Sequence, residues 1–175
     1  MKKTTKFKKL VLNDPILLCP VAHDPLCAKI IEQVGFQAVA SGGLACDAIK
    51  MGVPDTGLLT LTEMVDCAGR IADATDLPVL ADGDAGHGNV TNVIRTVQMF
   101  EKAGVASLMI EDQEEPTRCG HTSGKRLVTP QEMAGKIKAA IDTRKDPDFM
   151  IKARCDAIAV EGIDKAIERG KLYAE

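Results

Sequence analysis

The chain has 175 residues and a formal net charge of −3, and 45% of its residues are hydrophobic against 27% charged. This composition is that of a globular protein with enough length for one core, and its mild acidity argues against nucleic acid as a partner. No apolar run approaches the roughly 20 residues that a membrane-spanning helix needs. Six cysteines show no C-x-x-C pairing, which predicts free thiols and a reducing, cytoplasmic compartment.

The first ten residues are basic and contain five lysines. A solvated tail over residues 1–10 is the simplest interpretation. A lid over an anionic site and a transit-like segment are the alternatives. We expect the tail, because no long apolar segment follows and no arginine–serine bias accompanies the lysines.

Short apolar runs alternate with segments of helical periodicity along the rest of the chain. The predicted strands cover residues 16–22, 36–40, 78–81, 105–110 and 149–154. The predicted helices cover residues 25–34, 62–74, 89–103 and 129–144 and a last segment from residue 162, and residues 51–59 form a predicted loop. This alternation, with a spacing of roughly 30 residues, predicts parallel strands joined by right-handed crossovers.

Two α/β architectures are compatible with five strand–helix units. An open doubly wound sheet would be complete with five, whereas an eight-stranded barrel needs about 250 residues. Polar clusters follow the second, third, fourth and fifth strands and converge on one end of the sheet. That convergence favours a barrel mouth over a switch-point crevice, where fewer loops meet.

Acidic residues lie at two neighbouring strand ends. Asp82 and Asp84 follow the third strand, and Glu111 and Asp112 follow the fourth. Two carboxylates two residues apart point to the same side, and a cation relieves their repulsion. Oxygen ligands favour Mg²⁺, with Mn²⁺ as the alternative ion. The competing interpretation is a glycine-rich turn that caps the next helix. Adjacent strand ends lie about 5 Å apart, which strengthens the metal prediction.

One cysteine differs from the other five because it lies in a polar loop. Cys119 is flanked by Arg118 and His121, which would favour the thiolate. A nucleophilic role would require a base and an oxyanion hole, whereas a general acid need only reach a carbanion. An exposed thiol without a role is the third alternative.

Two further groups are candidates for binding an anion. Arg154 ends the fifth strand, where it would either clamp a carboxylate in bidentate fashion or form a structural ion pair with Asp156 or Asp82. Three residues after the second strand offer a hydroxyl and bare backbone N–H groups, or form a tight turn. These three are Ser41, Gly42 and Gly43. Asp55, considered alone, is a turn residue.

Five motifs, taken in order and spacing, resemble the isocitrate lyase and phosphoenolpyruvate mutase superfamily, and the methylisocitrate lyase-like branch is most similar. They are Ser41-Gly42-Gly43, Asp82-Gly83-Asp84-Ala85-Gly86-His87-Gly88-Asn89, Glu111-Asp112-Gln113, Arg118-Cys119-Gly120-His121 and Ala153-Arg154-Cys155-Asp156-Ala157. The resemblance implies a (β/α)8 TIM barrel, of which residues 1–175 would be one partial barrel with about the first five units. It also implies a homo-oligomer, a dimer or tetramer, in the full-length form.

The resemblance assigns a role to each candidate residue. The implied holders of Mg²⁺ or its waters are Asp82, Asp84 and Glu111. The implied contacts of a small carboxylate substrate are Ser41, Gly42, Gly43, Asp55, Gly120 and Arg154. The implied catalytic group is Cys119 with Arg118 and His121.

The implied activity is Mg²⁺-dependent cleavage of the C–C bond of a 2-hydroxy carboxylate such as 2-methylisocitrate, to pyruvate and succinate, with Cys119 as general acid. The alternatives are a 2,3-dimethylmalate-type lyase, an oxo-acid decarboxylase and a non-catalytic truncated barrel. Thr117 stands where lyases of this branch carry lysine, which lowers the local charge. Since three strand–helix units of the family are absent, we expect a fragment with little activity alone.

Overall fold

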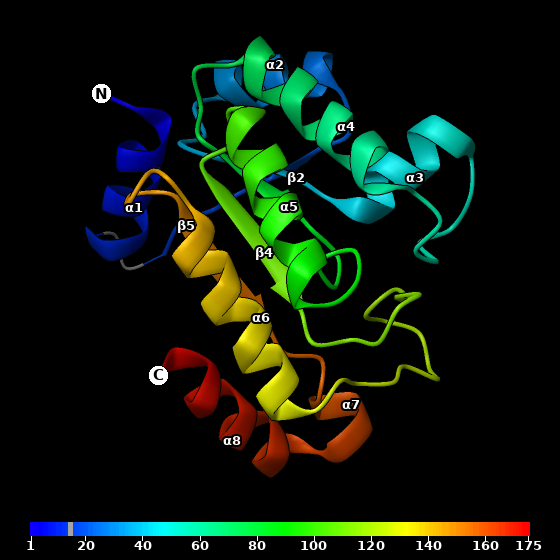
Figure 1. Ribbon diagram of the computed structural model, residues 1–175. Helices are drawn as coiled ribbons and strands as arrows, with labels where there is room; N and C mark the ends of the chain where they lie inside the picture. The colour runs from blue at the N-terminus through cyan, green and yellow to red at the C-terminus, as the bar shows by residue number, and fades with distance from the viewer. Residues whose placement is uncertain (14–15) are drawn as a thin grey trace.

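The computed structural model describes residues 1–13 and 16–175, and it has an α/β fold built on one parallel sheet (Figure 1). The strands are β1 (Val21–Ala22), β2 (Val39–Ser41), β3 (Val79–Asp82), β4 (Ser107–Glu111) and β5 (Met150–Arg154). The helices are α1 (Lys3–Asn13), α2 (Pro25–Val34), α3 (Gly43–Met51), α4 (Leu61–Ala74), α5 (Val90–Lys102), α6 (Pro130–Thr143), α7 (Ile158–Glu161) and α8 (Ile163–Ala174).

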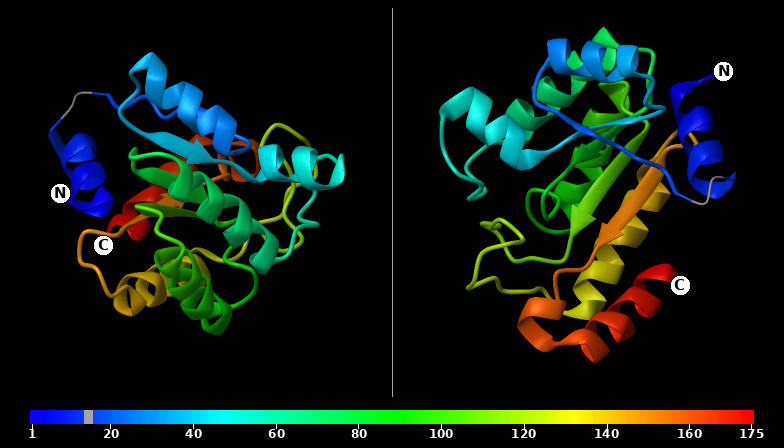
Figure 2. Two further views of the ribbon diagram at one scale, coloured as in Figure 1. Left: turned by 90° about the horizontal axis from the view of Figure 1, so that it is seen from above. Right: turned by 180° about the vertical axis from the view of Figure 1, so that it is seen from behind.

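The order of the strands decides between the two architectures that the sequence left open. The strands lie in the sheet in chain order, from β1 to β5, and every neighbouring pair is parallel. A doubly wound sheet would reverse this order at a switch point. Helices α2, α4, α5 and α6 pack in succession, α2 on α4, α4 on α5 and α5 on α6, outside the sheet (Figures 1 and 2). The chain is therefore an arc of a β/α barrel.

Alternation along β3 directs an acid to the inner face of this arc. Val79 and Ala81 belong to the main core under the helices, whereas Leu80 packs in a smaller cluster with Phe7. Successive side chains of a strand point to opposite faces. Asp82 consequently lies on the same face as Leu80, inside the barrel wall.

The ends of β4 and β5 follow the same rule. Leu108 and Ile110 pack into the main core, so Glu111 faces inward. Met150 packs against the inner cluster, and Arg154 shares its face four residues later. Glu111 and Arg154 are direct partners in the strand register. The carboxyl ends of three strands thus bring charged side chains to one inner edge.

The basic start of the chain is a helix, so the expectation of a solvated tail over residues 1–10 is wrong. Phe7 of α1 is 4% exposed and closes the inner cluster at the amino ends of the strands. Lys3 Nζ donates to the carbonyl oxygens of Ala72 and Thr75 at the end of α4, over 2.6 and 2.7 Å. Such contacts satisfy carbonyls that a helix C-terminus leaves free. The lysine-rich helix is therefore held on the fold by the buried side chain of Phe7, which the basic composition of this segment did not predict.

The first predicted strand is much shorter than expected. Residues 16–22 were predicted, but only Val21–Ala22 pair with β2. Pro20 has no N–H to donate to a ladder, and its carbonyl oxygen accepts the N–H of Ala40 over 2.8 Å. Ile16 is 75% exposed, so the apolar character of this run does not reflect a buried strand.

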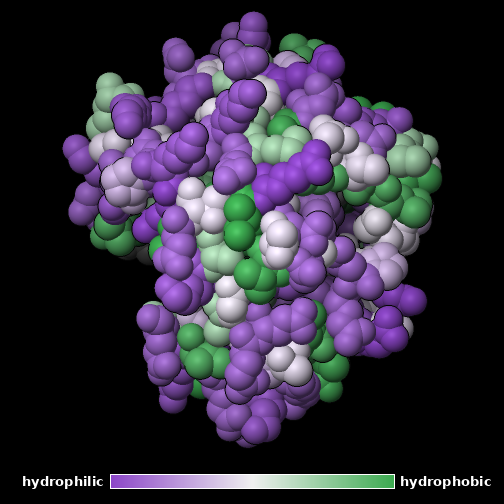
Figure 3. Space-filling model, viewed as in Figure 1, coloured by the Kyte–Doolittle hydropathy of each residue, from purple (hydrophilic) through white to green (hydrophobic). Residues whose placement is uncertain are grey.

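Besides α1, two helices were not predicted, the short α7 and the longer α3. Helix α3 begins after N-cap Gly42 and ends at Gly52, whose φ of 67° gives a left-handed C-cap. Its inner face buries Gly43, Cys46 and Asp47. Apolar side chains gather on the outer face, at the right of Figure 3, namely Leu44, Ile49 and Met51. The other predicted elements occur with ends shifted by a few residues.

Among the described residues, no helix has both the length and the apolar character that crossing a bilayer requires.

Candidate active site

Three acids at the inner edge are joined through the backbone. Gly43 donates its N–H to Asp82 Oδ2 over 3.0 Å, and Asp84 donates its N–H to Asp82 Oδ1 over 3.2 Å. The N–H of Glu111 donates to the carbonyl oxygen of Asp84 over 2.9 Å. The predicted metal-binding residues are therefore neighbours at the ends of β3 and β4, as the strand pattern required.

Two of these acids, Asp84 and Glu111, have raised pKa values, chiefly because they are buried. Burial, reinforced by the charge of Asp82, raises the pKa of Asp84 to about 8. Burial also raises the pKa of Glu111 to about 8, against the opposing charge of Arg154. Carboxyl groups in this condition ionise readily only when a cation shares their site. An all-oxygen donor set of this kind fits Mg²⁺ or Mn²⁺.

Backbone conformation holds Asp84 in place. Its φ of 46° lies in the left-handed region, which few non-glycine residues adopt. The preceding Gly83 packs so closely that an added Cβ would lie 2.8 Å from Leu108 Cδ1 and 2.9 Å from the Met109 carbonyl oxygen. Close packing therefore fixes the turn after β3, in addition to its acids. The competing interpretation, a glycine-rich turn that only caps the next helix, does not explain this packing.

Arg154 forms the ion pair that was one of its two predicted roles. Its guanidinium lies 3.0 Å from Asp156 Oδ2 and 3.1 Å, through Nε, from Asp156 Oδ1. Its third nitrogen, Nη1, lies 3.0 Å from Glu111 Oε2. All three guanidinium nitrogens thus face carboxylates, although the side chain is still about a third exposed. An added Cβ on Gly120 would overlap this guanidinium, so the glycine permits the loop to approach it.

Asp55 and Cys119 meet although 64 residues separate them. The Cys119 N–H donates to the carbonyl oxygen of Asp55 over 3.2 Å. The pKa of the Asp55 carboxyl is raised mainly by burial and then by the charge of Asp82, and the nearby Cys119 thiol acts in the opposite direction. Asp55 is therefore more than a turn residue, because it joins the thiol to the cluster of acids.

The side chains on either side of the thiol point elsewhere. His121 is exposed, and the Arg118 guanidinium lies beside Gly124, where an added Cβ would be 3.3 Å from Arg118 Nη1. The Cys119 thiol instead lies close enough to the Asp55 carboxyl to affect its pKa. Sequence proximity predicted Arg118 and His121 as its partners, whereas the fold brings a residue from the segment after α3.

Two residues that sequence reasoning did not single out hold the Cys119 loop. Gln113 is 1% exposed, accepts the Arg118 N–H over 3.0 Å, and donates to the Arg118 carbonyl oxygen over 2.9 Å. Lys125 is 8% exposed and donates to the carbonyl oxygens of Gly120 and Thr122 over 2.7 and 2.8 Å. Only the position of Gln113 directly after the strand's acids hinted at such a role. Nothing in the sequence signalled Lys125.

The Ser-Gly-Gly segment is used differently from a simple anion cradle. The hydroxyl of Ser41 is buried and lies 3.8 Å from Cys46 Sγ, on the helix side of the sheet. The N–H of Gly43 is committed to Asp82. Gly42 is the N-cap of α3, so the positive end of the helix dipole faces the acids. The two glycines therefore contact or face the acids, whereas the Ser41 hydroxyl contacts Cys46.

Asp112 supported the metal prediction, but it faces away from Glu111. It is fully buried, accepts the Tyr173 hydroxyl over 2.8 Å and the Asp156 N–H over 2.8 Å, and lies 3.5 Å from Arg169 Nη1. Adjacent residues at a strand end point to opposite faces. Asp112 therefore fastens α8 to the sheet.

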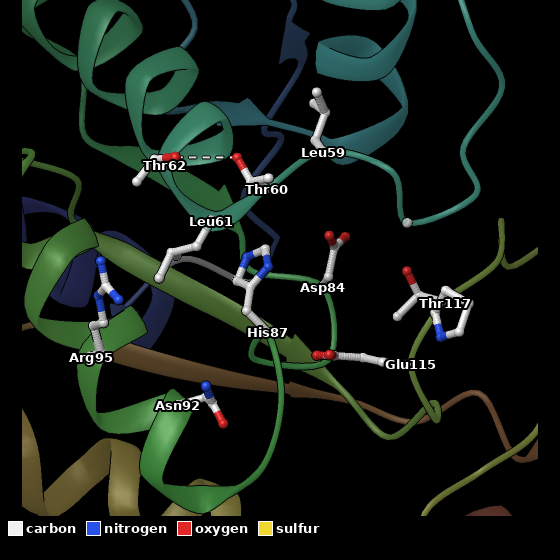
Figure 4. A pocket seen from close by; sticks show the side chains of 12 residues that line it. Leu59, Thr60, Leu61, Thr62, Asp84, His87, Asn92, Arg95, Glu115 and Thr117 are labelled. Atoms are coloured by element: carbon white, nitrogen blue, oxygen red, sulfur yellow. Dashed lines mark hydrogen bonds between the residues drawn. The ribbon is translucent and has the colours of Figure 1, made fainter.

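A polar cavity of about 470 Å³ adjoins the acids between the starts of α4 and α5 (Figure 4). Asp84 lies on its inner wall, and His87, Arg95 and Glu115 line it together with Thr117. The Nε2 atom of His87 is buried there without a hydrogen-bond partner among the described residues. Of the three acids at the inner edge, Asp84 is the one that lines this cavity.

Comparison with known proteins agrees with this geometry. Residues 7–175 match the family described as phosphoenolpyruvate phosphomutase. The chain is 50% identical over 175 residues to 2,3-dimethylmalate lyase of Eubacterium barkeri, with all of this chain and 61% of the relative covered. It is 42% identical over 168 residues to 2-methylisocitrate lyase of Shewanella oneidensis, with coverage of 96% and 58%.

A solved structure of phosphonopyruvate hydrolase with oxalate and Mg²⁺ superposes with a TM-score of 0.90 at 31% identity. The alignment covers 99% of this chain and 60% of that one. The chain thus spans about three fifths of the length of the relatives it matches. Strand order, the acids at the strand ends and these similarities agree: the chain belongs to the phosphoenolpyruvate mutase/isocitrate lyase superfamily.

Proposed function

We propose that this chain carries much of the active site of a divalent-metal-dependent lyase that cleaves the C–C bond of a 2-hydroxy carboxylate. The observation that carries the proposal is the convergence of Asp82, Asp84 and Glu111 within reach of a thiol, Cys119, through Asp55. Lyase names among the relatives support the same class of reaction.

The three acids would hold Mg²⁺ or Mn²⁺ directly or through water. A divalent cation there supplies positive charge to the oxygen that becomes negative when the hydroxyl proton leaves. Arg154, whose side chain stays about a third exposed, would contact a substrate carboxylate, while Glu111 and Asp156 fix the orientation of its guanidinium. The α3 N-terminus adds a favourable dipole for an anion.

Cys119 would serve as the general acid. When the bond between C2 and C3 breaks, C2 becomes the carbonyl carbon of pyruvate and the electron pair remains on C3 of the departing acid. The Cys119 thiol donates its proton to that carbon. Asp55 lies beside the thiol and, as a carboxyl whose pKa is raised by burial, would accept the proton that the substrate hydroxyl loses and return it to the thiolate. His121 and Arg118 would then shape the loop instead of tuning the sulfur.

Two substrates follow from this chemistry. Cleavage of 2-methylisocitrate gives succinate with pyruvate, and cleavage of 2,3-dimethylmalate gives propionate with pyruvate. The second substrate has one carboxylate fewer. Thr117 is 4% exposed, packs against Gly57 and brings no charge to the Cys119 loop. The absence of a cation at this position, together with 50% identity to a 2,3-dimethylmalate lyase, favours the dicarboxylate.

The test is pyruvate release from both substrates, with the parent protein and its Cys119→Ser form compared. A C–C lyase should lose at least about 100-fold of its rate, a typical contribution of a positioned acid. An oxo-acid decarboxylase that needs no proton from the Cys119 thiol would keep its rate in the variant. Cys67→Ser, a change at a core thiol of α4, is the control for general effects of removing a sulfur.

A further inference from the structure

One buried acid of α3 has no part in the site described so far. Asp47 is 3% exposed, and its Oδ1 atom has no hydrogen-bond partner among the described residues. Buried carboxylate oxygens are nearly always paired, and an unpaired one destabilises the fold. Such an exception requires an explanation, such as a functional role.

Its place on the helix directs Asp47 toward the acids. Asp47 follows Gly43 by four residues, so both occupy the same face of α3, about one turn apart. An added Cβ at Gly43 would lie 3.3 Å from Asp82 Oδ2 and 3.3 Å from Asp84 Oδ1. The face of α3 that carries Asp47 is thus the face that covers these carboxylates.

The surrounding charges are all of the same sign. Asp55 and Asp82 act electrostatically on Asp47, and Asp47 acts on Asp84. Lys50, the nearest cation along α3, pairs with Asp66 over 2.8 Å. A structural role would require a hydrogen-bond donor for Asp47. Its Oδ1 atom has no such donor among the described residues. A water molecule bound to a cation could donate the missing hydrogen bond.

We propose that Asp47 is a fourth carboxylate of the metal centre, which holds a water of the hydrated cation by accepting a hydrogen bond on Oδ1. Mg²⁺ usually keeps several waters and binds few carboxylates directly. Residues that orient those waters affect metal affinity almost as strongly as ligands do. The inference rests on the proposed function, because it presupposes a cation at Asp82, Asp84 and Glu111.

The experiment compares the 175-residue chain with its Asp47→Asn and Asp47→Ala variants. Isothermal titration gives the Mg²⁺ dissociation constant, and thermal unfolding without metal gives the midpoint. Both variants should weaken Mg²⁺ binding by at least about 10-fold, the usual lower bound for such positions. Both should also raise the metal-free midpoint, since each removes an unpaired buried charge. A merely structural acid would lower the midpoint and leave the Mg²⁺ affinity unchanged.

Asp73→Asn is the matched control, because Asp73 is an exposed acid of the adjacent α4; it should alter neither quantity. If the parent binds Mg²⁺ and Asp47→Asn binds it equally well, the inference fails while the proposed metal centre stands. If the parent shows no affinity for Mg²⁺, the proposed metal centre fails and the inference with it. The near-isosteric Asn variant keeps the comparison valid should the Ala variant unfold.

Discussion

Gly43 donates its backbone N–H to Asp82 Oδ2 over 3.0 Å, which joins the first turn of α3 to the end of β3. The contact crosses 39 residues of sequence. It places the positive end of a helix dipole on a carboxylate that also accepts the N–H of Asp84. The absence of a side chain at Gly43 is what allows the helix to come so close to both acids.

Gly43→Ala should weaken Mg²⁺ binding by about 10-fold, because one to two kcal/mol of contact with the acids is lost when they move. The new Cβ would lie 3.3 Å from Asp82 Oδ2 and from Asp84 Oδ1, tighter than ordinary contact. Calorimetric titration with Mg²⁺ measures the effect. The control is Gly170→Ala within α8, where an added Cβ meets nothing within 4 Å. That change should stabilise the chain by about 0.5–1 kcal/mol through helix propensity and leave Mg²⁺ affinity unchanged.

Mg²⁺ binding should release protons at pH 6. The pKa values of Asp84 and Glu111 are raised to about 8, so both groups are largely protonated at that pH in the metal-free chain. Because the cation binds ionised oxygens, about two protons should leave per ion at pH 6 and few at pH 9. Titration in buffers of different ionisation enthalpy counts them. Binding at pH 6 without proton release would contradict the proposed ligands.

The same two groups make the metal-free chain less stable as pH rises. Their ordinary pKa values are 3.8 and 4.5, so between about pH 4 and pH 8 the folded chain binds more protons than the unfolded chain. The free energy of unfolding therefore falls across this window, and the loss is complete above pH 8. Urea unfolding at pH 5, 7 and 9 measures the slope. Saturating Mg²⁺ should flatten it.

Arg169→Met should destabilise the chain by about 3 kcal/mol without affecting Mg²⁺ affinity. Arg169 is 5% exposed and its guanidinium binds Glu161 through two nitrogens over 2.7 and 2.8 Å. It also donates to the Val128 carbonyl oxygen over 2.9 Å and lies 3.5 Å from Asp112. Removing one partner of a buried ion pair leaves an unpaired charge. Urea unfolding checks the loss, and Lys165→Met, which breaks an exposed pair with Glu168 on the same helix, should leave the midpoint where it was.

Gln113→Leu should release the Cys119 loop while the metal centre persists. The variant removes the hydrogen bonds to the Arg118 backbone and the 2.7 Å bond to Asp156 Oδ2. Alkylation of Cys119 should accelerate by about 10-fold, as expected if opening becomes easier by more than one kcal/mol. Peptide mass spectrometry after timed alkylation follows this thiol separately from the other five. An unchanged alkylation rate would show that the loop is held by other contacts.

Strand–helix alternation and the residues at strand ends were predictable because they follow from local pattern. The acids after β3 and β4 met as expected, since parallel strands bring their carboxyl ends together. Other features depend on tertiary contacts that no local pattern encodes. The backbone hydrogen bond from the Cys119 N–H to the Asp55 carbonyl oxygen is one such feature, and the burial of Phe7, which turns a lysine-rich start into a docked helix, is another.

Side-chain direction was the least predictable property of the site. Ser41 and Asp112 belong to motifs that were predicted to form the site. Strand alternation nevertheless turns both side chains toward the helices. The choice between barrel and open sheet likewise rested on strand order, which the sequence does not state. Here the order from β1 to β5 decided it.

The central claim is that these five strand–helix units assemble the metal and carboxylate site, and thermal unfolding of the 175-residue chain tests it most directly. Scans are compared without ligand and with Mg²⁺ plus oxalate. A ligand at 100 times its dissociation constant adds about 2.7 kcal/mol to a folded form that alone binds it. For a chain of this length the midpoint should rise by about 5–10 °C in one cooperative transition. A cooperative transition that Mg²⁺ and oxalate leave unmoved, or no cooperative transition at all, would contradict the claim.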